Sequence, residues 1–243
     1  MRVLVISDIH ANITALDAVL EDAGSVDEVW CLGDLVGYGP DPNEVVEQLR
    51  KLSNLTCLLG NHDVAVLGEM NFAVFNTEAR KSLVWQQQEI NPINMEFLRN
   101  LPRETMVKGN VSLAHGSPRD PIWEYVLNTL VARLNFEAFH TSYCFVGHSH
   151  IQCLFHLDTK KDRITSEILR VGETFKLSPR AILNPGSVGQ PRDRDPRASY
   201  AIFDSKAETW EPCRVEYDIE KVQKRIRAAG LPEKHALRLA EGW

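Results

Sequence analysis

The stretch "VLVISDIH", residues 3–10, decides how the chain begins to fold. Four apolar residues, Val3 to Ile6, are followed by Ser7, Asp8 and, two positions later, His10. A short apolar run that ends in polar residues is typical of a strand buried on both faces. We therefore expect a buried strand over residues 3–6, with Asp8 and His10 just beyond its carboxyl end.

Strand and helix patterns alternate through the first sixty residues. We predict further strands over residues 28–32 and 55–59, and helices over residues 12–21 and 42–52. Asp41 precedes a proline at the first position of the second helix, so we expect Asp41 to be the N-cap residue of that helix. This alternation implies a parallel sheet with right-handed crossovers.

The rest of the chain changes character twice. Residues 64 to about 100 carry helical patterning, and we expect this segment to cap the site. After residue 150 the chain is rich in strands. We find no linker and predict a single domain over residues 1–243. The other predicted elements are a hairpin around Lys108-Gly109-Asn110, helices over 127–139 and after Asp218, a final short helix, and strands over 143–146, 153–157, 163–169, 181–183, 199–203 and 209–215.

Composition excludes several classes of protein. The 243 residues are 44% hydrophobic and 25% charged, as in ordinary globular proteins, and the net charge is −6. An acidic balance argues against a broad nucleic-acid or membrane surface. No window approaches the roughly 20 apolar residues of a membrane span. The five cysteines are odd in number and form no CxxC pair, so we expect free thiols and a cytoplasmic location.

Polar clusters follow five of the predicted strands. In open α/β sheets ligands bind beyond the carboxyl ends of strands, so these clusters should converge on one edge. Five of the eight histidines belong to them. Taken singly, each aspartate is an ordinary turn former or helix cap, Asn61 is a turn residue, and a histidine is an ordinary surface or core residue. We assign no role to the remaining histidines. The clusters are Asp8 with His10, Asp34, Asn61 with His62 and Asp63, His115, and His148 with His150.

The chemistry of the clusters indicates a metal centre. Aspartate, histidine and asparagine make an oxygen and nitrogen ligand set that suits divalent transition metals. In extended segments, residues two apart point to the same side. Asp8 and His10 can therefore face one ion, and His148 and His150 can reach the same small volume.

These stretches resemble the motifs of the calcineurin-like metallophosphoesterase superfamily, and most of all its small prokaryotic phosphodiesterase-like members. The motifs are DIH at Asp8, GD at Gly33, GNHD at Gly60, a histidine at His115 and GHSH at Gly147. They occur in the family's order, and the resemblance spans residues 1 to 204. It implies an α/β fold, a four-layered α/β/β/α sandwich of two mixed β-sheets flanked by helices.

The resemblance also implies a dinuclear metal-dependent phosphoesterase. It would hydrolyse phosphodiesters or small phosphomonoesters by attack of a metal-bridging hydroxide. The cofactors would be two divalent transition-metal ions, with manganese as first choice and iron, zinc, nickel or cobalt as alternatives. One ion would be held by Asp8, His10, Asp34 and His150, and the other by Asp34, Asn61, His115 and His148.

Further residues receive roles from the resemblance or from their position. His62 matches a non-ligand catalytic histidine that faces the phosphate and, if protonated, neutralises it or protonates the leaving group; Asp34 acts with it by bridging the ions. Asp63 either orients His62 or caps a helix. Asn12 either holds a metal ligand or the phosphate, or it caps a helix.

The loop over residues 184–192 either contacts substrate through Arg192 or is purely structural. Tyr38 either stacks on a leaving group or packs within its loop. Ala11 replaces a glycine found in many members, so we expect a turn after His10 that an L-residue can adopt. Leu59 stands where the Ser/Thr protein phosphatases carry arginine, which makes protein phosphatase activity less favoured.

Two other functions remain open. The chain could be a catalytically weak metal-binding scaffold or interaction protein of the same fold. It could also be a nuclease, although its acidic balance disfavours nucleic acid other than short or cyclic nucleotides. The expected partner is a small phosphoester substrate, no membrane contact is expected, and the sequence leaves the oligomeric state open.

Overall fold

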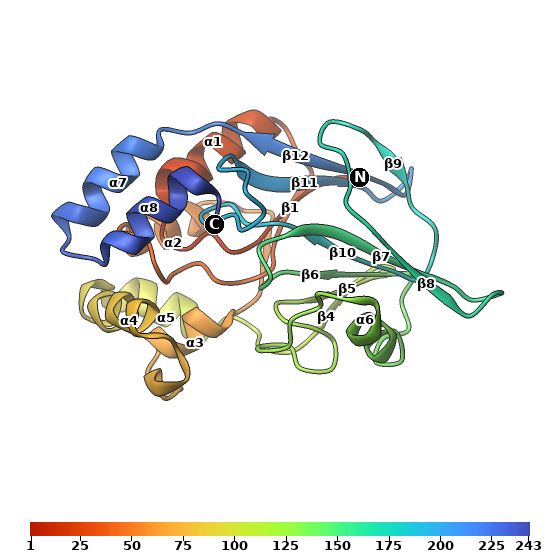
Figure 1. The fold of residues 1–243 in the computed structure, drawn as a ribbon, viewed down its shortest axis with the longest axis horizontal. Helices are drawn as coiled ribbons and strands as arrows, with labels where there is room; N and C mark the ends of the chain where they lie inside the picture. Colours follow the sequence, from red (N-terminus) through yellow and green to blue (C-terminus); the bar gives the residue numbers. More distant parts are fainter.

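The computed structural model describes residues 1–243 as two six-stranded sheets packed face to face, with helices on both outer faces (Figure 1). Both sheets are mixed, because β1, β2 and β3 run parallel while β11 is antiparallel to β1, and β5, β6 and β10 run parallel while β7 is antiparallel to β10. The predicted four-layered sandwich is therefore confirmed.

In spatial order the first sheet contains β3 (Leu55–Cys57), β2 (Glu28–Cys31), β1 (Arg2–Ile6), β11 (Ala198–Asp204), β12 (Thr209–Val215) and β9 (Phe175–Lys176). The second contains β4 (Met106–Lys108), β5 (Val111–Ala114), β6 (Tyr143–Val146), β10 (Ala181–Pro185), β7 (Gln152–Asp158) and β8 (Arg163–Glu167).

The helices are distributed over both sheets and one end of the molecule. Figure 1 shows α7 and α8 at the end opposite β8 and β9. No helix is both long enough and apolar enough to cross a lipid bilayer. The helices are α1 (Ile13–Ala23), α2 (Pro42–Arg50), α3 (Asn61–Val66), the 3₁₀ turn η1 (Phe72–Val74), α4 (Thr77–Glu89), α5 (Pro92–Arg99), α6 (Thr129–Phe136), α7 (Ile219–Ala228) and α8 (Glu233–Glu241).

Strand β1 shows how the alternation of side chains builds two cores from one apolar run. Val3 and Val5 point into the core between the sheets, whereas Leu4 and Ile6 pack against the helices on the outer face. Burying each such side chain stabilises the fold by roughly 1.5–3 kcal/mol. Because both faces of β1 are covered, its carboxyl end is fixed in the middle of the molecule.

The two predicted N-cap residues, Asp41 and Asp218, use their side chains differently. Asp41 occupies the N-cap of α2, but its side chain makes no capping hydrogen bond. Its carboxylate instead accepts hydrogen bonds from Arg225 of α7, at 2.7 and 2.8 Å. The predicted N-cap position is therefore confirmed, but the side chain does not bond to the helix because an ion pair with α7 occupies its oxygens. Asp218 does cap α7, accepting from the backbone N–H of Lys221 at 2.9 Å.

The segment over residues 64–100 is helical, as predicted, and packs beside α2. The α7–α8 pair is fastened to the rest of the fold by the Arg225–Asp41 ion pair and by His235, whose Nε2 lies 3.2 Å from the carbonyl oxygen of Glu78. These contacts favour the single-domain division, which stays a prediction. All five cysteines are unpaired.

Candidate metal centre

The loops that follow β1, β2, β3, β5 and β6 meet at one edge of the two sheets. They bring together all seven predicted ligands, and we call this set of seven side chains the metal edge. His62 lies beside it. None of these side chains is more than 4% exposed. The metal edge consists of Asp8, His10, Asp34, Asn61, His115, His148 and His150.

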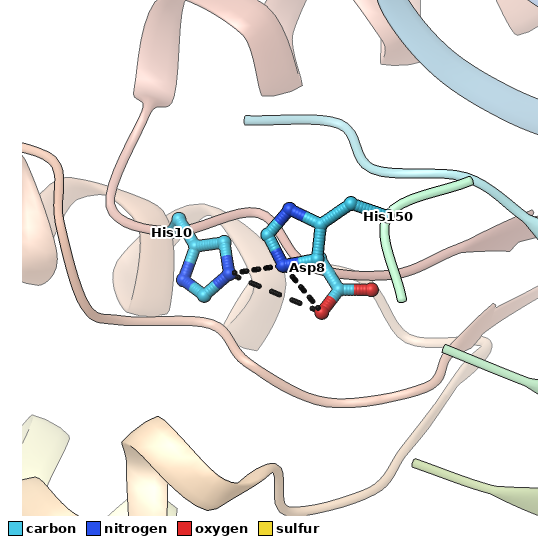
Figure 2. Close-up of side chains that lie close together, drawn as sticks. All are labelled: Asp8, His10 and His150. Atoms are coloured by element: carbon cyan, nitrogen blue, oxygen red, sulfur yellow. Dashed lines mark hydrogen bonds and ion pairs between the residues drawn. The ribbon is translucent and has the colours of Figure 1, made fainter. Parts of the chain in front are cut away.

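The first group of side chains in the metal edge contains Asp8, His10 and His150 (Figure 2). Nε2 of His150 lies 3.3 Å from Oδ1 of Asp8, and Nε2 of His10 lies 3.9 Å from the same oxygen. The two Nε2 atoms are 3.1 Å apart. Three potential ligand atoms therefore surround one small volume.

The second group contains Asp34, His115 and His148, with Asn61 beside them. Nε2 of His115 lies 3.1 Å from Oδ1 of Asn61 and 3.2 Å from Nδ1 of His148. Oδ2 of Asp34 lies 3.5 Å from Nε2 of His115 and 3.7 Å from Nε2 of His10. A single carboxylate oxygen therefore faces both groups.

The candidate ligand atoms fit metal ions because their lone pairs face one another and no hydrogen-bond donor lies between them. Nδ1 of His10 lies 2.9 Å from the carbonyl oxygen of Val36, and Nδ1 of His150 lies 2.5 Å from that of Gln190. Those contacts require a hydrogen on each Nδ1, which leaves each Nε2 as a lone pair. Two lone pairs 3.1 Å apart repel each other. Oδ1 of Asp8 and Oδ2 of Asp34 are likewise buried without a hydrogen-bond partner, so cations between these atoms would satisfy them all.

Burial dominates the electrostatics of the metal edge. It raises the pKa of Asp8 to about 7 and lowers the pKa of His115 to about 4. The pKa of Asp34 is raised well above its ordinary value by burial, and then by the neighbouring carboxylates of Asp63 and Asp8. Charged carboxylates are costly here unless a bound cation compensates them.

The backbone of the metal edge is held in the left-handed region of φ. Asp8, Asp34 and both histidines of the GHSH motif have φ between 54° and 63°. Such a conformation costs an L-residue roughly 1–2 kcal/mol, and it clusters at functional sites. Ala11 also adopts it, at φ 50°, so the turn after His10 is left-handed and alanine occupies it at some cost.

The loop over residues 184–192 supports the ligands from behind. Oγ of Ser187 and the N–H of Gly189 both donate to the carbonyl oxygen of Asp8, at 2.7 and 3.0 Å. A Cβ on Gly189 would lie 1.8 Å from the carbonyl oxygen of Ile9, so only glycine fits. These contacts give the loop the structural role that the sequence left open.

His62 lies against the metal edge, and its ring centroid is 4.9 Å from that of His10. Its Nδ1 is buried without a hydrogen-bond partner. Burial first, and then His10, lower the pKa of His62 well below its ordinary value, which disfavours the protonated form that the sequence considered. Asp63 accepts from the N–H groups of Gly60 and Val36, at 2.9 and 3.0 Å. The hydrogen bonds of the Asp63 carboxylate therefore cap α3, and they do not orient the His62 ring.

Asn12 and Arg192 are placed differently. The amide oxygen of Asn12 accepts from the N–H of Ala15, and its Nδ2 donates to the carbonyl oxygen of Gly189, both at 3.1 Å. Helix capping and Gly189 therefore occupy both groups of the Asn12 amide, and a contact of Asn12 with substrate stays a prediction. Nη2 of Arg192 lies 3.2 Å from Oη of Tyr38, and its buried Nε has no partner.

A cavity of about 420 Å³ lies beside the metal edge, and sequence reasoning had singled out only Tyr38 and Arg192 among its lining residues. Tyr125 stacks on His148, with ring centroids 3.8 Å apart and an interplanar angle of 14°. The run "PIWEY" over residues 121–125 was a usable signal, because aromatic residues are unusual in a polar loop. Arg238 gave no signal, because a charged position on an amphipathic helix is normally a solvent-exposed one. The nine lining residues are Tyr38, Asn76, Tyr125, Leu127, Ser149, Ile151, Arg192, Arg238 and Trp243.

Comparison with known proteins gives consistent results. Residues 1–208 match the calcineurin-like phosphoesterase superfamily domain. An uncharacterized protein of Methanocaldococcus jannaschii is 40% identical over 238 residues, which cover 95% of this chain and 94% of that protein. The crystal structure of a metallophosphoesterase from Sphaerobacter thermophilus is 46% identical, superposes with a TM-score of 0.91 and is matched over 100% of both chains.

A shorter match joins this chain to a symmetrical bis(5'-nucleosyl)-tetraphosphatase of Baumannia cicadellinicola. It is 38% identical over 71 residues, which are 28% of this chain and 25% of that enzyme. Because the domain match covers residues 1–208, this chain belongs to the calcineurin-like phosphoesterase superfamily.

Proposed function

We propose that the protein is a dinuclear metal-dependent phosphoesterase that hydrolyses phosphodiesters or small phosphomonoesters. The observation that carries the proposal is the position of Asp34, whose unpartnered Oδ2 faces a histidine from each of the two groups. Asp34 would bridge the two ions. Asp8, His10 and His150 would complete one site, and Asn61, His115 and His148 the other. We propose manganese first, while iron, zinc, nickel and cobalt accept the same donors.

When bound, the two ions supply a hydroxide at neutral pH and neutralise charge on the phosphoryl oxygens. The chain itself positions the reacting groups. In the hydrolysis a bond forms from the water oxygen to phosphorus, the bond from phosphorus to the leaving oxygen breaks, and that oxygen gains a proton. His62, as a neutral ring, offers one N–H to a phosphoryl or leaving oxygen.

Arg192 supports the same reaction by its charge. Its neighbours Asp193 and Asp195 are paired with Arg214 and Arg197, so the Arg192 guanidinium keeps its positive charge uncompensated. A phosphate is a strong partner for such a group.

The unpaired thiols support the cytoplasm as the compartment.

The relatives support this reaction class. The match to the tetraphosphatases, although short, favours substrates in which the phosphate is attached to a nucleoside. The complete set of candidate ligands, together with His62, counts against a scaffold that binds metal without turnover.

Metal removal and restoration test the proposal. We expect chelator-treated protein to be inactive, and manganese to restore hydrolysis of bis-p-nitrophenyl phosphate or of p-nitrophenyl phosphate, which separates a diesterase from a monoesterase. Elemental analysis should find two equivalents of metal per chain. Two bound ions without hydrolysis of either ester would favour the scaffold instead.

A further inference from the structure

The cavity beside the metal edge has the composition of a binding site. Its volume of about 420 Å³ lies within the range of small-molecule sites, about 300–1,000 Å³. Tyr125 forms part of its wall. One face of the Tyr125 ring covers His148, while the residue is 44% exposed and offers its other face to the cavity.

The charged side chains that line the cavity are all positive. Its nine lining side chains include two arginines and no carboxylate. Arg192 donates only to neutral groups, Oη of Tyr38 and Oε1 of Gln190. The Nε atoms of both Arg192 and Arg238 are buried without a partner. Two guanidinium groups without counter-charges indicate that the ligand itself brings negative charge.

Arg238 comes from a part of the chain outside the superfamily domain. It lies in α8, beyond the part of the chain that matches the superfamily domain. The Arg225–Asp41 ion pair holds α7 and α8 in place, and His235 packs on Tyr38 with ring centroids 5.1 Å apart. The C-terminal helices therefore place a cation and an aromatic side chain, Trp243, at the entrance to the metal edge.

A second cavity of comparable size lacks these features. It has a volume of about 390 Å³ and is lined by residues at the amino ends of β2, β5 and β6, Glu28, Val111 and Tyr143. That is the edge opposite the metal edge. Its Lys108 is already paired with Glu28 at 3.1 Å. It offers neither uncompensated charge nor access to the candidate ligands.

We propose that the cavity selects nucleotides that carry a second phosphate in addition to the scissile one. A base would lie against the open face of Tyr125, and the second phosphate would pair with Arg238, next to Arg192. A nucleotide fits because it combines a planar ring with phosphate groups, which are the partners that an aromatic ring and guanidinium groups accept. This proposal rests on the phosphoesterase function proposed above and names its substrate class.

Three p-nitrophenyl esters test the selection, because the same phosphorus–oxygen bond breaks in each and p-nitrophenolate is released. Bis-p-nitrophenyl phosphate carries no nucleoside. The p-nitrophenyl ester of thymidine 5'-phosphate adds a base, and that of thymidine 3',5'-bisphosphate adds a base and a second phosphate. We expect KM to fall along this series, with at least about a tenfold difference between the two nucleoside esters, because hydrogen bonds to charged groups contribute strongly.

Replacing the arginine gives the decisive comparison. In Arg238→Ala we expect the KM ratio of the two nucleoside esters to fall towards one, with kcat for the bisphosphate ester changed much less than KM. Arg238→Gln, which keeps most of the side-chain length, should lose the same discrimination if the charge is responsible. The control is Arg227→Ala in the neighbouring helix, whose exposed side chain pairs with Glu233. It should leave all three KM values as in the wild type.

The outcomes separate the two proposals. Failure to hydrolyse any of the three esters with metal added would overturn the phosphoesterase function itself. Hydrolysis of all three with equal KM values would overturn only the nucleotide selection. Equal effects of Arg238→Ala on both nucleoside esters would also overturn it, since the residue would then not contact the second phosphate.

Discussion

The metal edge and the wall of the neighbouring cavity are built in opposite ways. The side chains of the metal edge are almost fully buried, and several sit on left-handed turns that their neighbours hold in place. Around the cavity, Tyr125 is half-exposed, and the guanidinium groups of Arg192 and Arg238 are uncompensated. The difference teaches that the reacting groups are fixed by the core of the fold. The groups that would choose the substrate come from loops and from a C-terminal helix; among them, Arg238 of α8 makes none of the contacts that hold the candidate ligands, whereas Tyr125 stacks on His148.

The largest effect should follow a change in the metal edge itself. In Asp34→Asn the side chain keeps its shape but loses the charge that faces both groups of ligands. Loss of a single oriented group in comparable sites costs about 10²–10³-fold in rate, and Asp34 serves two sites, so we expect kcat/KM to fall at least about 10³-fold. The loss should be equal for all three p-nitrophenyl esters. Elemental analysis and steady-state kinetics measure it.

The control for this variant is Asp17→Asn, an exposed position on α1. Circular dichroism should show that both variants keep the fold. Turnover of Asp34→Asn at the wild-type rate would remove the bridging role. A loss restricted to one ester would break the division between a metal edge that reacts and a cavity that selects.

An intermediate effect is expected for His62→Ala. Removal of one hydrogen-bond donor to a developing charge typically costs about 10²–10³-fold, and we expect kcat to fall about 10²-fold while both metal equivalents remain. Metal content and kcat are measured on the same sample, with exposed His140→Ala as the control. If one metal equivalent is lost, His62 is a ligand, since it also lies within reach of His10 and Asp34.

The smallest effect on chemistry should come from Arg225→Ala, which removes the ion pair between α7 and Asp41 but leaves the contact of His235 with Glu78. Asp41 would remain buried without its partner, which lowers the free energy of unfolding by about 1–3 kcal/mol. Burial already raises the pKa of Asp41, and loss of Arg225 would raise it further. The deficit should therefore be largest above that pKa and shrink as the pH falls and the carboxyl group gains a proton.

Thermal unfolding at several pH values measures this deficit, and Arg227→Ala serves as the control, because its exposed ion pair contributes less than about 1 kcal/mol. An unchanged melting temperature across the pH range would show that the C-terminal helices do not depend on this ion pair. A loss of activity as large as that of Asp34→Asn would contradict the separation of the two regions.

Much of the fold could be predicted because its signals are local. Apolar runs gave the strands and turn residues gave the hairpin, and polar residues at strand ends gave a common edge. The structure brings those side chains together, while their roles as ligands stay predictions. The two-residue strand β9 is too short to show a pattern, and it is defined only by its pairing with β12.

The remaining features depend on partners that sequence spacing does not show. Asn12 had two equal interpretations, and the hydrogen bond to Gly189, 177 positions away, accounts for the amide group that capping leaves free. Asp41 had a standard capping position, but Arg225 lies 184 residues further along the chain. Arg238 has the sequence context of a solvent-exposed arginine, and only the fold places it in the wall of the same cavity as Arg192.

The contacts of the 184–192 loop also bear on how the protein is made. A ribosome that has translated residue 62 has produced four of the seven candidate ligands. However, Ser187, Gly189 and strand β11, which hold Asp8 and β1 in position, are still to come. A nascent chain therefore has no finished pocket for cations, and their uptake must follow synthesis of almost the entire polypeptide.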